Sequence, residues 1–495
     1  MKLPHVLNKG NLINILIISL IISLTYYLSL KFVFPGYFEP LTPFNTDFYL
    51  LYSGSPLADY IDLYKWPRPI GVLLINLVST LGLKLGIAFS ITLTLINILL
   101  TILCIRLIRG NVSYLIIAIY VTNLFTAPYF YINHSWLILD TFAYLFFILI
   151  IILWYKYKTD FNINKMLLIS FLIFLCFFTK ETYIIAVVLF FIFQFIFEKK
   201  LRKYSLSLII ISAVFILVLV IHSYLINSMF VNFKNTSDSP YYINMNPKDI
   251  ITTYLFYLWG IGNIYNVLIV ILSMTILIFT KKYIKEVIMF IVLGLSIYIP
   301  YSLVPNHKLG FYCCLGSPLI YAVILFINTD VFSKVKTKIF NKISFNKKIA
   351  FSVVVIIFIA LTFFNIDFIK NSYHTARIYL LEEPINRNIL NSLEKVDQEL
   401  SSSKDNNVLI LGLKQIPHHP FKGAEFINNY FNTKHNNWTI ALYNDLWIKA
   451  NKEIRSRNGS IFRYIDIGEI TPNDYNIVII YNQNGELEKI IHNTE

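Results

Sequence analysis

Long apolar runs recur along this chain of 495 residues and limit its fold more than any other feature. Several reach the roughly 20 residues that an α-helix needs to cross a bilayer. Only 14% of the residues are charged, whereas soluble proteins average about a quarter. The pattern predicts a mostly α-helical, polytopic membrane protein with about eleven transmembrane helices and additional juxtamembrane helices.

Basic residues gather in short blocks beside the apolar runs, so the net charge of +14 indicates membrane topology. A nucleic-acid-binding protein would carry a basic stripe on a soluble domain, and we expect no nucleic-acid partner. The segment 333–348 holds six lysines and no acid. With it and the N-terminus in the cytoplasm, we expect spans at about 12–34, 85–107, 112–129, 136–155, 166–178, 183–197, 207–230, 264–280, 287–304, 311–327 and 349–364.

The apolar segment at about 70–82 is short of a full crossing and is read as a helix that lies on, or dips into, the outer face. A short amphipathic segment at about 250–259 precedes the span at 264–280. The first run is read as an anchor, because it is long and lacks a clear cleavage site for a signal peptidase. Four cysteines are expected to be free thiols: Cys104, Cys176, Cys313 and Cys314. No Cys/His spacing indicates structural zinc.

The composition becomes that of a soluble protein after Asp367. We therefore divide the chain into a transmembrane region, 1–366, and a small extracytoplasmic α/β domain, 367–495. In that domain the pattern predicts helices near 382–401, 421–431 and 443–454, and strands near 407–413, 438–443 and 476–481.

A polar segment, Phe44 to Gly71, lies between two apolar runs, in the first outer loop. Asp47 is either a general base or the N-cap of a short helix, and spacing alone does not separate the two. Arg68 is held between two prolines and suits a phosphate, of a substrate or of a lipid headgroup. Asp59 and Asp62 fit the solvated face of a short helix.

Other charged residues fall in the remaining outer loops. Asp140 caps a helix or serves as a second acid, and Lys180 with Glu181 forms a simple ion pair or a substrate contact. In the late outer loop, the candidates for phosphate binding are His307, Lys308 and Tyr312, although an ordinary interfacial loop explains them equally well.

In combination these features resemble the GT-C superfamily of membrane glycosyltransferases, which includes protein O-mannosyltransferases and the aminoarabinose transferase of lipid A. The matching features are an Asp after the first span (Asp47), Arg68-Pro69, a second acid (Asp140), a Lys at a hairpin tip (Lys180) and the late segment PNHKLGFYCCLGSP. The Asp-Asp or Asp-Glu pair of some members and the WWD-type motif of oligosaccharyltransferases are missing.

The resemblance implies a sugar donor linked to polyprenyl phosphate and a glycan, lipid or protein acceptor on the outer side of the membrane. It implies Asp47 as the base, with Asp140 and Glu181 as further catalytic candidates. Arg68, Lys180, His307, Lys308 and Tyr312 would hold the donor phosphate. A divalent metal is left open. Abundant Ile, Asn and Lys suggest an AT-rich, bacterial genome, and we expect the protein in a bacterial inner or plasma membrane.

Three alternative functions are weighed against this one. A polysaccharide polymerase or ligase would favour a large late outer loop, and the late loops here are short. A lipid-sugar flippase would favour inverted repeats and mid-membrane charges, and neither is visible. A membrane scaffold for the C-terminal domain would leave the outer charges unexplained.

Overall fold

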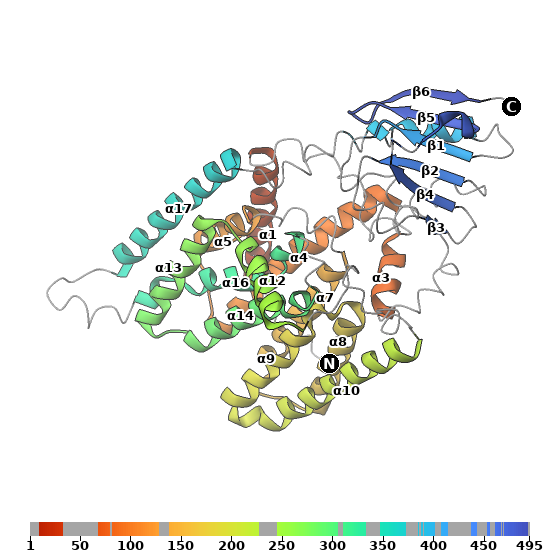
Figure 1. Ribbon diagram of the computed structural model, residues 1–495. Helices are drawn as coiled ribbons and strands as arrows, with labels where there is room; N and C mark the ends of the chain where they lie inside the picture. Colours follow the sequence, from red (N-terminus) through yellow and green to blue (C-terminus); the bar gives the residue numbers. More distant parts are fainter. Residues whose placement is uncertain are drawn as a thin grey trace. The chain divides into compact units, whose positions relative to one another are not determined.

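In a computed structural model, the chain divides into two compact units (Figure 1). The first unit is built mainly from residues 87–373, with 1–38 and 57–75, and the second from 374–495, with 39–56 and 76–86. The residues described below are 9–32, 68–79, 82–127, 138–226, 245–304, 310–332, 347–372, 385, 388–389, 391–400, 407–413, 437–442, 453–455, 461–466, 468 and 470–493.

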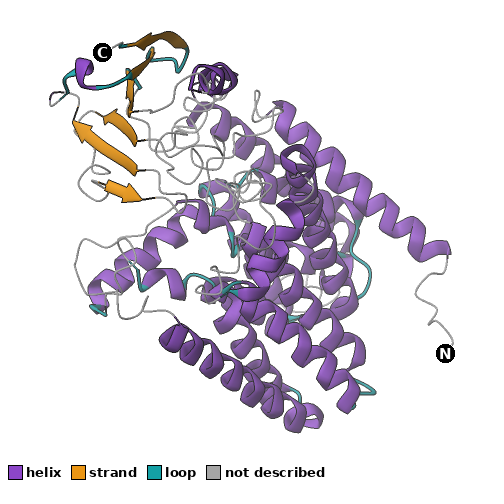
Figure 2. Ribbon diagram, turned by 90° about the vertical axis from the view of Figure 1, so that its right-hand side faces the viewer, coloured by secondary structure: helices purple, strands orange, loops and turns teal. Residues whose placement is uncertain are grey.

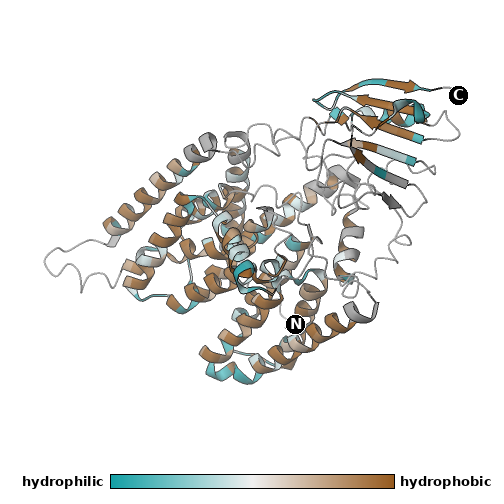
Figure 3. Cartoon of the chain, viewed as in Figure 1, coloured by the Kyte–Doolittle hydropathy of each residue, from teal (hydrophilic) through white to brown (hydrophobic). Residues whose placement is uncertain are grey.

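The first unit is helical and follows the apolar pattern of the sequence (Figure 3). Its helices are α1 (Lys9–Phe32), α3 (Pro69–Ser79), α4 (Gly82–Arg109), α5 (Tyr114–Phe125), α7 (Ile138–Tyr157), α8 (Ile163–Thr179), η3 (Glu181–Tyr183), α9 (Ile184–Phe197), η4 (Lys199–Leu201), α10 (Arg202–Ile226), α12 (Pro247–Gly260), α13 (Ile264–Thr280), α14 (Ile284–Ser296), α15 (Ile299–Ser302), η5 (Gly310–Cys314), α16 (Ser317–Tyr321), η6 (Ala322–Phe326) and α17 (Lys347–Ser372).

Five of the described helical stretches are long and apolar enough to cross a membrane. They are Ala88–Arg109, Leu139–Tyr157, Lys199–Ile221, Ile284–Ser302 and Lys348–Ile366, and the bent pair α12 and α13 would raise the number to six. This supports a helical membrane protein, but not the eleven spans predicted from the sequence. Several predicted spans, among them α5 with 12 residues and α9 with 14, are shorter than a bilayer normally requires.

The helices differ in how much of their surface is covered by protein. In α7, 61% of the apolar stretch is buried, whereas in α10 and α17 the share is 22%. Side chains such as Ile210 and Phe363 therefore expose apolar surface, as lipid-facing residues do. We conclude that α7 is central in the helical unit and that α10 and α17 are peripheral.

The predicted span 311–327 is apolar and helical, but irregular. It is broken into η5, α16 and η6 in place of one continuous helix. A side chain at Gly316 would collide with the carbonyl of Gly294 and the hydroxyl of Tyr298, so the segment is packed closely against α14. Its residues from Ser317 to Ile327 are buried in protein, where irregular backbone is tolerated at membrane depth.

The second unit contains a six-stranded sheet with the order β3-β4-β2-β1-β5-β6 (Figure 1), whose strands are orange in Figure 2. Its strands are β1 (Asn407–Leu411), β2 (Asn437–Leu442), β3 (Glu453–Arg455), β4 (Ile461–Asp466), β5 (Ile477–Tyr481) and β6 (Leu487–His492). The central four strands are parallel, and β3 and β6 are antiparallel edges.

The sequence correctly predicts β1, β2 and β5, because these are continuous apolar runs that become buried on both faces. It misses β4 and the two edge strands. Glu453 and Ile454 were assigned to a helix and instead form β3, whose pairing with β4 overrides the local pattern. Residues 391–400 are helical as expected, and 421–431 lies outside the described residues.

Candidate functional site

Arg68 and Glu181 form an ion pair across 113 positions of sequence. The guanidinium Nε donates to Glu181 Oε2 over 2.6 Å, and Nη2 donates to Oε1, so the contact is bidentate. Arg68 immediately precedes α3, with Pro69 at the first helical position. Gly71 then lies against α8, because a Cβ there would come within 2.6 Å of the Thr179 carbonyl oxygen. This close approach brings Arg68 to Glu181.

A second pair lies beside the first. Lys180 Nζ is 3.6 Å from Asp140 Oδ2, and both side chains are almost fully buried. Asp140 lies in the first turn of α7, and Lys180 ends α8 with extended backbone. The other carboxylate oxygen, Oδ1, accepts hydrogen bonds from Thr182 (2.8 Å) and Tyr301 (3.2 Å). Residues from α7, α8, η3 and α15 thus meet at the buried carboxylate of Asp140.

Aromatic rings cover the buried pair. Lys180 Nζ lies 6.0 Å from the centre of the Tyr312 ring, which stacks on Tyr301 with centroids 4.2 Å apart. Tyr257 of α12 contacts Tyr301 at 5.9 Å. Lys180 is almost fully buried, and the face of the Tyr312 ring offers its ammonium group the negative charge of a π system.

The charges of this cluster are fixed by their neighbours. Burial raises the pKa of Glu181, but Arg68 and Lys180 outweigh it and lower that pKa to about 2. Burial by itself would lower the pKa of Arg68. The negative charges of Glu181 and Asp140 together have the larger, opposite effect and raise this pKa, so the guanidinium remains protonated. Glu181 is thus a carboxylate at neutral pH and a weak proton acceptor.

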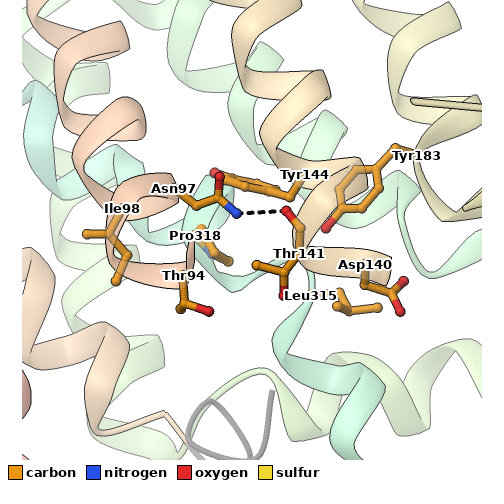
Figure 4. Close-up of a pocket in the computed structure, with 9 residues that line it drawn as sticks. All are labelled: Thr94, Asn97, Ile98, Asp140, Thr141, Tyr144, Tyr183, Leu315 and Pro318. Atoms are coloured by element: carbon orange, nitrogen blue, oxygen red, sulfur yellow. Dashed lines mark hydrogen bonds between the residues drawn. The ribbon is translucent and has the colours of Figure 1, made fainter. Parts of the chain in front are cut away.

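A small cavity of about 30 Å³ adjoins Asp140 (Figure 4). Its lining includes Thr94 and Asn97 of α4, Thr141 and Tyr144 of α7, and Tyr183. Asn97 donates to the Thr141 carbonyl over 2.8 Å. A cavity of this size has room for about two water molecules, so it is too small for a sugar.

The structure brings together five of the residues predicted for the site: Arg68, Asp140, Lys180, Glu181 and Tyr312. Asp47, His307 and Lys308 lie outside the described residues, and their roles remain predictions. Within the part of the chain that is described, no three His, Cys, Asp or Glu side chains are grouped as metal ligands.

Sequence reasoning missed Thr182 and Tyr301. Thr182 directly follows Lys180 and Glu181 in the same hairpin tip, so its position beside these two residues could have identified it as a site residue. Tyr301 lies in the segment IYIPYS, within the short helix α15, and nothing in its local pattern separates it from an interfacial tyrosine.

No family model and no curated protein sequence matches this chain.

Proposed function

We propose that the protein is a membrane glycosyltransferase that moves a sugar from a polyprenyl-phosphate donor to a glycan, lipid or protein acceptor. The observation that carries this proposal is the cluster of two cations, Arg68 and Lys180, each held by its own carboxylate at the meeting point of α3, α7, α8 and η3. The GT-C resemblance of the sequence points to the same residues.

The two cations suit the departing phosphate of such a donor. Negative charge on the phosphate grows as the glycosidic bond breaks, and preorganised donors that face it lower the barrier. The Arg68 side chain keeps 19% of its surface exposed and that of Glu181 keeps 43%, so a ligand can reach this pair. Glu181 orients the guanidinium, which matches phosphate geometry.

The described carboxylates are better suited to hold cations than to remove protons. Glu181 remains ionised, and Asp140 accepts from Thr182 and Tyr301 beside Lys180. We therefore assign both to positioning roles, and we keep Asp47 as the proposed base that takes a proton from the acceptor.

The distribution of charge supports an extracytoplasmic site. The helices that carry Asp140 and Lys180 have basic residues at their opposite ends, at Lys156 in α7 and Lys165 in α8. Lys199 and Lys200 follow α9 in the same way. By the positive-inside rule, these ends are cytoplasmic and the cluster faces the outside.

Binding of polyprenyl phosphate, the leaving group itself, tests the proposal without knowledge of the sugar. The dissociation constant is measured for the full-length protein in nanodiscs. Loss of a hydrogen-bonded charge costs about 1.5–3 kcal/mol, so Arg68→Ala should weaken binding by roughly 10- to 100-fold. Arg202→Ala is the matched control, because Arg202 bonds to Phe195 near the basic end of α9. Equal affinities of wild type and Arg68→Ala would contradict the phosphate role.

A further inference from the structure

Helix α12 presents two contrasting faces. Ile251, Leu255 and Trp259 follow each other at intervals of four residues and therefore share one side of the helix. Their exposed fractions are 58%, 56% and 89%. We name these three residues the apolar stripe. On the opposite side, Thr253 and Tyr257 are buried.

The buried face joins α12 firmly to the helical unit. The Tyr257 ring lies parallel to that of Tyr298 at 6.0 Å and also contacts Tyr301. The Tyr254 hydroxyl donates to the Leu295 carbonyl over 3.1 Å. The orientation of the apolar stripe is therefore set by packing on its far side.

A sharp corner separates α12 from the next helix. The axes of α12 and α13 differ by 91°. Tyr321 donates to the carbonyl of Ile261 over 2.8 Å, and Asn263 begins α13 with a capping box. The corner is thus stabilised by side chains that close both helix ends.

Helix α13 has the length and character of a membrane span. Most of its 17 residues are apolar and none is charged, and at about 1.5 Å per residue they extend roughly 25 Å, close to the thickness of the hydrocarbon core. Ile271 and Phe279 expose apolar surface along its outer side. A helix perpendicular to such a span lies parallel to the membrane plane.

We propose that α12 is an interfacial helix whose apolar stripe inserts into the headgroup and acyl boundary of the lipid bilayer. Tryptophan is preferred at this depth, because its ring is apolar while its N–H needs a polar partner. Asn246, Lys248 and Asp249 at the start of the helix supply charge and polarity for the headgroup layer. Since the opposite face carries Tyr257, contact with lipid would also fix the ring that packs on Tyr301.

Tryptophan fluorescence of the full-length protein in nanodiscs tests this proposal. The contribution of Trp259 is obtained as the difference between wild type and Trp259→Phe, because the chain has six tryptophans. We expect that contribution to be quenched by lipids brominated near the headgroup end of the acyl chain. Bromine near the terminal methyl should quench it less, and aqueous iodide should have little effect.

Two results would overturn the proposal. Quenching by iodide but not by bromine would place Trp259 in water, and protection from both would show that protein covers the stripe. A labelled cysteine gives an independent reading, since all four native cysteines are buried. An environment-sensitive dye at Leu255→Cys should report an apolar setting, while the same dye at Thr329→Cys, an exposed position in a short 3-10 turn, should report water. This measurement does not depend on the proposed enzymatic function.

Discussion

At the scale of single residues, the buried pair of Lys180 and Asp140 has a large expected effect on stability. Removal of one partner from a buried ion pair typically costs about 3–5 kcal/mol, because the remaining charge is left without compensation. We expect Lys180→Met to lower the free energy of unfolding by about this amount. Adding Asp140→Asn to Lys180→Met should recover part of the loss, as chemical unfolding in detergent would show.

The control for this pair is Lys158 with Glu198. These side chains are about 40% exposed and 4.0 Å apart, so Lys158→Met should cost less than about 1 kcal/mol. Equal losses for Lys158→Met and Lys180→Met would contradict a special role for burial.

The lowered pKa of Glu181 predicts how the stability of the folded protein depends on pH. Its pKa falls from an ordinary 4.5 to about 2 in the folded protein, against the effect of burial, because Arg68 and Lys180 favour the carboxylate. Its contribution to stability is therefore complete above pH 4.5 and disappears as the pH falls through about 2. Thermal unfolding of wild type and Glu181→Gln should differ by a constant amount above pH 4.5, and the difference should shrink below it. A difference that grows with falling pH would show that the pair does not favour the carboxylate.

At the scale of elements, the site depends on the contact of α3 with the end of α8. A Cβ at Gly71 would lie 2.6 Å from the backbone oxygen of Thr179, which cannot rotate away. Gly71→Val should therefore displace the start of α3 and separate Arg68 from Glu181. We expect polyprenyl phosphate to bind at least as weakly as it binds Arg68→Ala. Leu73→Ala changes an exposed position of the same helix and should leave binding unchanged.

The elements also show what local pattern can and cannot predict. The hairpin of α8 and α9 is evident in the sequence, because two apolar runs flank a short charged tip. Lys180 and Glu181 at that tip are unusual residues for a turn, and each forms an ion pair in the structure. Their partners were not predictable, because the pairing of Arg68 with Glu181 depends on how distant helices pack. The irregular form of residues 310–326 could not be predicted for the same reason, because burial in protein, and not the composition of the segment, decides that form.

At the scale of the whole molecule, the charge pattern predicts that the C-terminal unit lies outside the cell membrane. The basic ends of α7 and α8 would be cytoplasmic, and the chain would leave α17 on the opposite side. An alkaline phosphatase reporter fused after Glu495 should therefore be active in a bacterial host. If the phosphatase fusion is inactive and a green fluorescent protein fused at the same position is fluorescent, the C-terminal unit lies in the cytoplasm and the predicted orientation is wrong.

The most direct measurement of the central claim is mass spectrometry of surface glycans and lipids from cells with and without the gene. Cells that lack it should accumulate a species one sugar short, and wild-type protein should restore the missing sugar. Asp47→Asn should be inserted in the membrane at normal levels and should fail to restore it, because the proposed base has lost its charge. Unchanged glycans in the absence of the gene, or full restoration by Asp47→Asn, would contradict the account.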